Sequence, residues 1–105
     1  MHRLAMVVAM FAMFDASANA QSEIGDTHEG REFARNVCIA CHLVDKTETN
    51  DTDYEATAFQ TIADNIAHTR LSLRVFLTTP HKDMPNLVLT DTQTDNIIAY
   101  ILSLR

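Results

Sequence analysis

Apolar residues recur with a helical period along much of the chain after residue 25. From Asp26 to Cys41 the small and apolar positions fall at i, i+3, i+4, i+7, i+8 and i+11, one continuous stripe on a helix. A second stripe predicts a short amphipathic helix from about Ala58 to Ala67. From about Asp91 to Leu104 the pattern is apolar on most sides, which predicts a well-buried helix. The first stripe consists of Gly30, Phe33, Ala34, Val37, Cys38 and Cys41, and the second of Phe59, Ile62, Ala63 and Ile66.

The stretch from Leu71 to Leu77 has two possible periods, since its apolar residues fit either an alternating strand or a helix. An N-cap at Thr69 and a stop at Pro80 favour the helix. Capping boxes also mark the first helix and the last: Asp26 with Glu29, and Thr90 with Gln93. We therefore predict an all-α fold of three to four helices.

Gly30 is unusual inside a predicted helix, because glycine there costs about 1 kcal/mol relative to alanine. Either another helix crosses closely at this point, or the glycine lies in a frayed first turn. The sequence leaves both explanations open.

Two segments between the predicted helices are expected to be irregular. Residues 45–57 are polar, acidic and rich in threonine, as in a surface loop. Pro80 to Leu89 should also be irregular, because Pro80 and Pro85 prevent regular continuation.

The first 20 residues have the pattern of a secretory signal peptide. Arg3 supplies the positive start, an apolar run follows from Leu4 to Phe14, and Ala18-Asn19-Ala20 offers a cleavage site. Eleven apolar residues are too few to span a bilayer. We expect cleavage before Gln21, one domain over residues 21–105, and a periplasmic location.

The charge of the chain bears on its partners. There are 8 basic and 14 acidic residues, and the formal net charge of −6 survives removal of the first 20 residues, which hold one charge of each sign. An acidic surface disfavours nucleic acid and anionic membranes and favours partners with basic patches.

Both cysteines of the chain lie in Cys38-Ile39-Ala40-Cys41-His42. C-x-x-C-H is the attachment signature of c-type haem. In that chemistry the two thiols form thioethers with the porphyrin, and the adjacent imidazole binds the iron. Cysteines three residues apart lie on the same side of a helix, as a covalent clamp requires.

Three other uses of a C-x-x-C pair must be weighed. A redox dithiol usually lies in a βαβ setting, which is absent here. A zinc site would need further ligands that no other cysteine supplies, and a disulfide fits poorly across three helical residues. With the export signal, the motif favours one haem c bound through Cys38 and Cys41.

Four of the five methionines lie in residues 1–20, so Met84 is the one methionine of the mature chain. If a thioether is the second axial ligand of the iron, it must come from Met84. His81, three residues earlier, or His68 could displace it and give a bis-histidine haem. The position of Met84 directly before Pro85 favours the methionine as the second axial ligand.

Together these residues resemble a class I cytochrome c of the short bacterial monohaem type. The matching parts are Gly30 and Phe33 before the C-x-x-C-H motif, the segment from Pro80 to Pro85, and a last helix with Tyr100. The resemblance implies first and last helices that cross at a small residue and an aromatic, here Gly30 with Tyr100 or Phe33. It also implies a backbone carbonyl that orients His42.

Members of that family often carry this carbonyl on a proline in the loop after the histidine. This chain has neither proline nor glycine between His42 and Pro80. We expect a carbonyl from about Ala56 to Ala58 to take that place.

The expected function is one-electron transfer by a low-spin haem with His42 and Met84 on the iron. No general base, nucleophile or open metal position is evident, so an enzyme is not expected. Two alternatives stay open: a five-coordinate or bis-histidine haem protein that binds a gas or acts as a small peroxidase, and a haem subunit of a larger periplasmic oxidoreductase. The expected partners are redox proteins, and a monomer is expected.

Overall fold

Helix α4 is the element against which the other helices pack. The computed structural model describes residues 24–46, 56–81 and 84–105. Within them the chain forms α1 (Thr27–Asn36), the 3₁₀ helix η1 (Cys38–Ala40), α2 (Phe59–Asp64), α3 (Arg70–Thr78) and α4 (Asp91–Ser103). These residues contain helices and no strand, so the all-α prediction is confirmed. The expected signal peptide and most of the expected loop at 45–57 lie outside the described residues.

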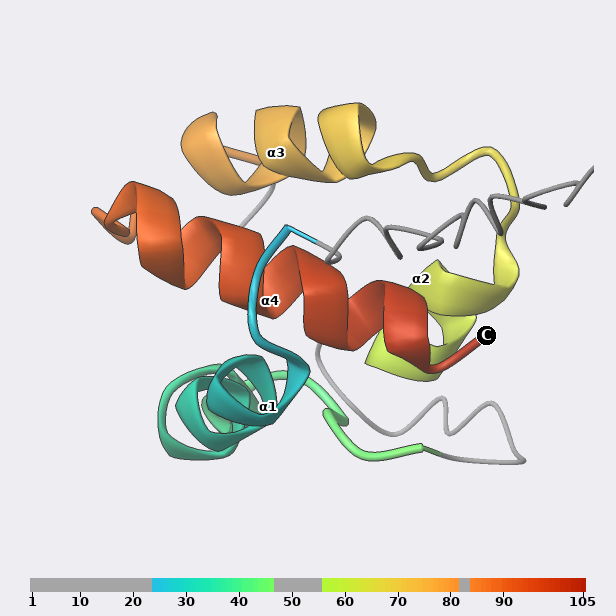
Figure 1. Ribbon diagram of the computed structural model, residues 1–105. Coiled ribbons are helices and arrows are strands. Elements are labelled where there is room, and N and C mark those ends of the chain that lie inside the picture. Colours follow the sequence, from blue (N-terminus) through green and yellow to red (C-terminus); the bar gives the residue numbers. More distant parts are fainter. Residues whose placement is uncertain (1–23, 47–55, 82–83) are drawn as a thin grey trace, which may run out of the picture.

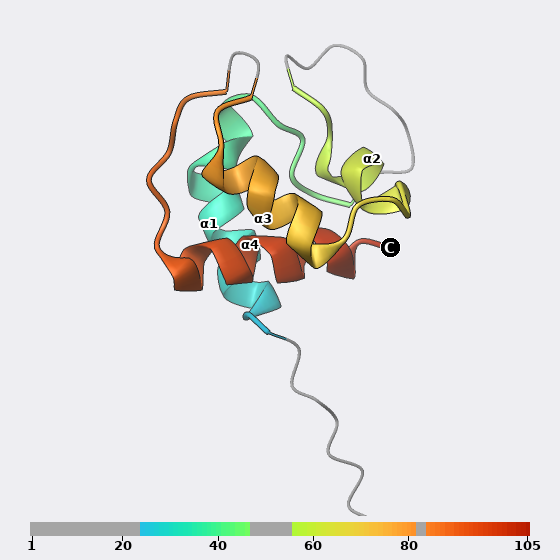
Figure 2. The ribbon, with the colours of Figure 1, turned by 90° about the horizontal axis from the view of Figure 1, so that it is seen from above.

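Three helices surround α4. In Figure 1, α3 lies on one side of α4 and α1 on the other, and Figure 2 shows α1 and α4 crossing at a steep angle. Helix α2 packs beside the carboxyl-terminal part of α4. The core between these elements is apolar and takes residues from every α-helix: Ala34, Val44, Phe59, Ala63, Leu73, Ile97, Ile98, Tyr100, Ile101 and Leu104.

Gly30 lies where α1 crosses α4. A Cβ atom at this position would stand 2.5 Å from the carbonyl carbon of Asn96 and 2.9 Å from Cβ of Tyr100. Contacts this short leave no room for a side chain, so the two backbones meet because Gly30 has none. Of the two explanations that the sequence left open, the close crossing is confirmed.

The residues just before α1 also contact α4. Gly25 has a positive φ of 96° and lies against the backbone of Asp95. The N–H of Asp26 donates to Oδ1 of Asn96 at 2.8 Å, while the Asp26 carboxylate accepts the N–H of Glu29. The predicted capping box is therefore half right, because the N-cap N–H is bonded by Asn96 and not by Glu29.

The prediction of one helix from Asp26 to Cys41 is wrong at its end. Helix α1 stops at Asn36, and Val37 leaves the helical region with φ −120° and ψ −53°. The cysteine motif then forms a 3₁₀ turn, with the N–H of Cys41 bonded to the carbonyl of Cys38. Apolar periodicity cannot detect this change, since residues i and i+3 share a face in both kinds of helix.

Helix α2 is shorter than the predicted span from Ala58 to Ala67. It ends at Asp64, and the Asn65 side chain then accepts the N–H of Ala67 in a local turn. The Arg105 guanidinium donates to the carbonyl of Ala63 at 2.7 Å and also to that of Asn65. These hydrogen bonds satisfy carbonyls at the end of α2. In a longer helix the same carbonyls would have accepted N–H groups of later helical residues.

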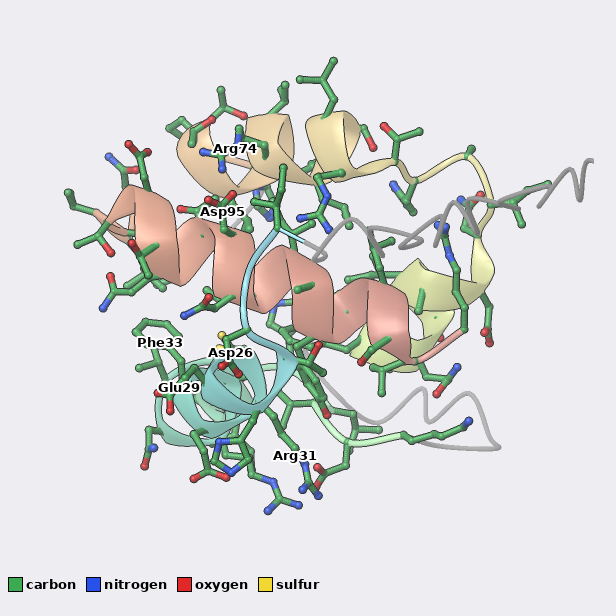
Figure 3. The ribbon with its side chains drawn as sticks, viewed as in Figure 1. Asp26, Glu29, Arg31, Phe33, Arg74 and Asp95 are labelled. Atoms are coloured by element: carbon green, nitrogen blue, oxygen red, sulfur yellow. The ribbon has the colours of Figure 1, made fainter. Side chains whose placement is uncertain are left out.

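The prediction of a helix around Leu71 to Leu77 is confirmed. Thr69 and Ser72 form a capping box at the start of α3, and Thr90 with Gln93 forms the predicted one on α4. Arg74 reaches from α3 to the Asp95 carboxylate on α4, as Figure 3 shows. The described residues between Pro80 and Leu89 are irregular, as expected.

None of the helices in the described part of the chain combines the length and the apolar character needed to cross a bilayer.

Candidate functional site

The two cysteines lie in the 3₁₀ turn that follows α1. This geometry has three residues per turn, so Cys38 and Cys41 stand on the same side of the turn. Both are half-buried, and neither is in a disulfide. Burial raises the pKa of the Cys38 thiol to about 11, so this group stays protonated at neutral pH. Two separate thiols on one side of a turn can form two thioether bonds to one planar group.

His42 follows directly, and one nitrogen of its ring is already engaged. Nδ1 of His42 lies 2.6 Å from the carbonyl oxygen of Thr57. A carbonyl only accepts hydrogen bonds, so Nδ1 carries the proton and donates it. Nε2 then has a free lone pair, the form in which a neutral imidazole binds a metal.

Backbone pairing holds the Thr57 carbonyl in place. The N–H of Ala56 donates to the carbonyl of Cys41 at 3.2 Å, and the N–H of Phe59 donates to that of Leu43 at 2.9 Å. These two bonds lie on either side of the contact between His42 and Thr57. The orienting carbonyl is thus within the expected range, and paired backbone does the work that the resemblance assigned to a proline.

Two buried aromatic rings follow one another next to His42. The ring of Phe59, the first residue of α2, lies 5.3 Å from that of His42, and the ring of Tyr100 lies 6.3 Å from that of Phe59. The Tyr100 hydroxyl donates to the carbonyl of Val44 at 2.6 Å. Sequence reasoning did not assign Phe59 to the site, because the apolar pattern marks it only as a core residue.

Replacing Tyr100 with phenylalanine should lower the free energy of unfolding by about 1 kcal/mol near neutral pH, because the Val44 carbonyl loses its donor. Burial, with the Asp45 carboxylate, raises the pKa of Tyr100 above its ordinary value of 10.0, and Arg31 and Arg35 partly offset this. The unfolded phenol therefore loses its proton first. Stability present below about pH 10 is lost as the pH rises through the folded pKa.

Urea unfolding of both proteins at several pH values tests this prediction. The wild type should lose stability more steeply than Tyr100→Phe above about pH 10. The difference in free energy of unfolding between the two proteins should therefore narrow. A difference that stays constant up to about pH 11 would contradict it.

Met84 lies in the irregular segment after α3, in a separate part of the chain from the cysteine turn. It is half-buried and lines a small pocket with Phe76 and His81. Its backbone N–H donates to the carbonyl of His81 at 3.1 Å. This local turn places the thioether beside the end of α3.

The two alternative histidines meet at one aromatic ring. The rings of His68 and His81 both lie edge-on to that of Phe76, at 5.8 and 5.6 Å. His81 is half-buried in the pocket that holds Met84, where the ring of Phe76 gives it a surface to pack on.

The residues present fit a covalently attached haem in their chemistry. Cys38 and Cys41 are free thiols, His42 has an imidazole with Nε2 available, and Met84 adds a soft sulfur donor. Imidazole and thioether are the axial donors of iron in c-type cytochromes.

Comparison with known proteins agrees with this chemistry. The family model described as cytochrome c matches residues 27–105. Cytochrome c-552 of Bradyrhizobium diazoefficiens is 30% identical over 90 residues, which cover 86% of each chain. No solved structure gives a significant match. The chain therefore belongs to the cytochrome c family, as a class I c-type cytochrome with one haem c bound covalently through Cys38 and Cys41.

Proposed function

We propose that this cytochrome is a periplasmic one-electron carrier in which His42 and Met84 are the two axial ligands of the haem iron. The bound haem supplies the one-electron iron couple, and a methionine ligand raises its potential by favouring the ferrous state. The observation that carries the proposal is the hydrogen bond from Nδ1 of His42 to the carbonyl of Thr57, which leaves Nε2 available to bind a metal.

A carrier needs ligands that stay in place when the charge of the iron changes. His42 meets this need because its ring is bonded at Nδ1 and packed against Phe59. The backbone of Met84 is restrained on both sides. Its N–H is bonded to the carbonyl of His81, and the next residue, Pro85, has a restricted backbone. A site with little freedom needs little rearrangement on electron transfer.

The proposed location rests on the sequence. Residues 1–20 supply a signal peptide that is cleaved before Gln21, and residues 21–105 form the mature cytochrome domain. Covalent haem attachment outside the cytoplasm agrees with export. The mature carrier is a monomer, and its net charge of −6 favours redox partners with basic docking patches.

Carbon monoxide separates a six-coordinate carrier from a five-coordinate gas-binding haem protein or peroxidase. The protein should be expressed with its leader in a host with haem-attachment machinery, and its intact mass should equal the chain from Gln21 plus one haem. The reduced protein should then show little carbon monoxide binding at neutral pH, because Met84 occupies the sixth position. Rapid and complete binding would contradict the carrier, and size-exclusion chromatography would reveal an obligate complex.

A further inference from the structure

One hydrogen bond does not fix the plane of an imidazole. The His42 ring turns about two side-chain torsions, and the second of these, between sp³ and sp² atoms, has broad and roughly two-fold minima. The bond from Nδ1 to the Thr57 carbonyl fixes one atom of the ring. The ring can still tilt about the line that joins Nδ1 of His42 to the carbonyl oxygen of Thr57. A second contact is therefore needed to set the plane of the ring.

Phe59 supplies that second contact. The two ring centroids are 5.3 Å apart and their planes meet at 57°. This is within the distance range of favourable aromatic pairs, in which the edge of one ring approaches the face of the other. Phe59 is only 4% exposed, and its own N–H is bonded to the carbonyl of Leu43, the residue after His42. Backbone and ring of Phe59 therefore both engage the segment that carries the imidazole.

Tyr100 in turn limits the movement of Phe59. Its ring lies 6.3 Å from that of Phe59 at 55°, and its hydroxyl is bonded to the carbonyl of Val44. Its Cβ lies at the Gly30 crossing of α1 and α4. The three rings thus form a continuous column from the helix crossing to His42, and the hydroxyl ties that column to the backbone two residues beyond His42.

We propose that Phe59, supported by Tyr100, is a positioning residue that sets the plane of the His42 imidazole. This inference rests on the proposed function in one respect, that His42 binds the haem iron through Nε2. The imidazole plane decides how the ligand's π orbitals overlap with those of the iron, so a ring free to tilt changes the electronic state of the haem. In this chain Phe59 constrains the ring from the side, and the paired backbone at Thr57 holds it at the nitrogen.

The test compares three variants of the haem-loaded protein. Phe59→Leu keeps an apolar side chain but removes the planar ring. Phe33→Leu is the matched control, because Phe33 packs against the same core from α1 and is not part of the column. Tyr100→Phe keeps the ring of the column and removes only the bond to Val44.

Three measurements report on the His42 ring. In the reduced protein, solvent exchange of the Nδ1 proton should be about tenfold faster in Phe59→Leu than in wild type, given the strength of an aromatic contact. The electron paramagnetic resonance g-values of the oxidised form and the reduction potential should also shift. Phe33→Leu should match wild type in all three, and Tyr100→Phe should lie between wild type and Phe59→Leu.

The outcomes separate this inference from the proposed function. If wild-type spectra show no imidazole ligand from His42, the proposed function itself fails. If they show it, and Phe59→Leu differs from Phe33→Leu only in thermal stability, Phe59 is an ordinary core residue and the positioning role is wrong. A shift in Phe59→Leu with unchanged coordination supports it.

Discussion

Replacing Gly30 with alanine should lower the free energy of unfolding by about 3 kcal/mol, a large part of the stability of so small a domain. In an isolated helix the same change would be stabilising by about 1 kcal/mol. The sign reverses because the new methyl group meets backbone atoms of Asn96, which cannot rotate away as a side chain can. Relief requires α1 and α4 to separate, and that would open the core around Tyr100.

The matched control is Glu32→Ala, an exposed position on the same helix. Its stability should stay within about 0.5 kcal/mol of the wild type. Urea unfolding of the haem-loaded proteins, followed by far-ultraviolet circular dichroism, measures both. A Gly30→Ala protein that loses less than about 1 kcal/mol would mean that the crossing is not as close as described.

Replacing Met84 with alanine should abolish the sulfur-to-iron charge-transfer band of the oxidised protein and lower its reduction potential. A thioether favours ferrous iron, so its loss favours the ferric state. The reduced variant should also bind carbon monoxide readily, because its sixth position is open. The fold should survive, since Met84 lies in an irregular segment and is only half-buried.

Val88→Ala is the control for this experiment. Val88 lies in the same irregular segment and is 95% exposed, so its truncation should leave band, potential and carbon monoxide response unchanged. If the band survives in Met84→Ala, the assignment of Met84 is wrong. If the band is lost but the variant stays six-coordinate, His81 is the candidate replacement, because it lines the same pocket. The double variant Met84→Ala/His81→Ala would then become five-coordinate.

The elements that the sequence predicted well have their signals close together along the chain. The starts of α3 and α4 rest on capping pairs three residues apart, Thr69 with Ser72 and Thr90 with Gln93. The stop at Pro80 is a property of proline itself. The cysteine motif likewise needs no knowledge of the fold, because five adjacent residues carry its chemistry.

What the sequence left open depends on contacts between distant residues. The end of α2 is determined in part by Arg105, about 40 residues later, whose guanidinium takes carbonyls of that turn. The choice of Thr57 as the partner of His42 follows from backbone pairing of Ala56 with Cys41 and of Phe59 with Leu43. Neither an arginine nor a threonine predicts such a role by its residue type, because these atoms come together only in the folded chain. The role of Gly30 was also undecided until α4 was in place.

The bond from the N–H of Asp26 to Asn96 spans 70 positions, and the bond from Arg70 to the carbonyl of Ile24 spans 46. The start of the domain is therefore completed by its end, and each of these contacts closes a long loop against chain entropy. A chain that emerges from its amino terminus presents the cysteine turn long before α4 is available to close the core. Until α4 has emerged, the bond between Asp26 and Asn96 cannot form, so both cysteines are present in the chain before the two ends of the domain can meet.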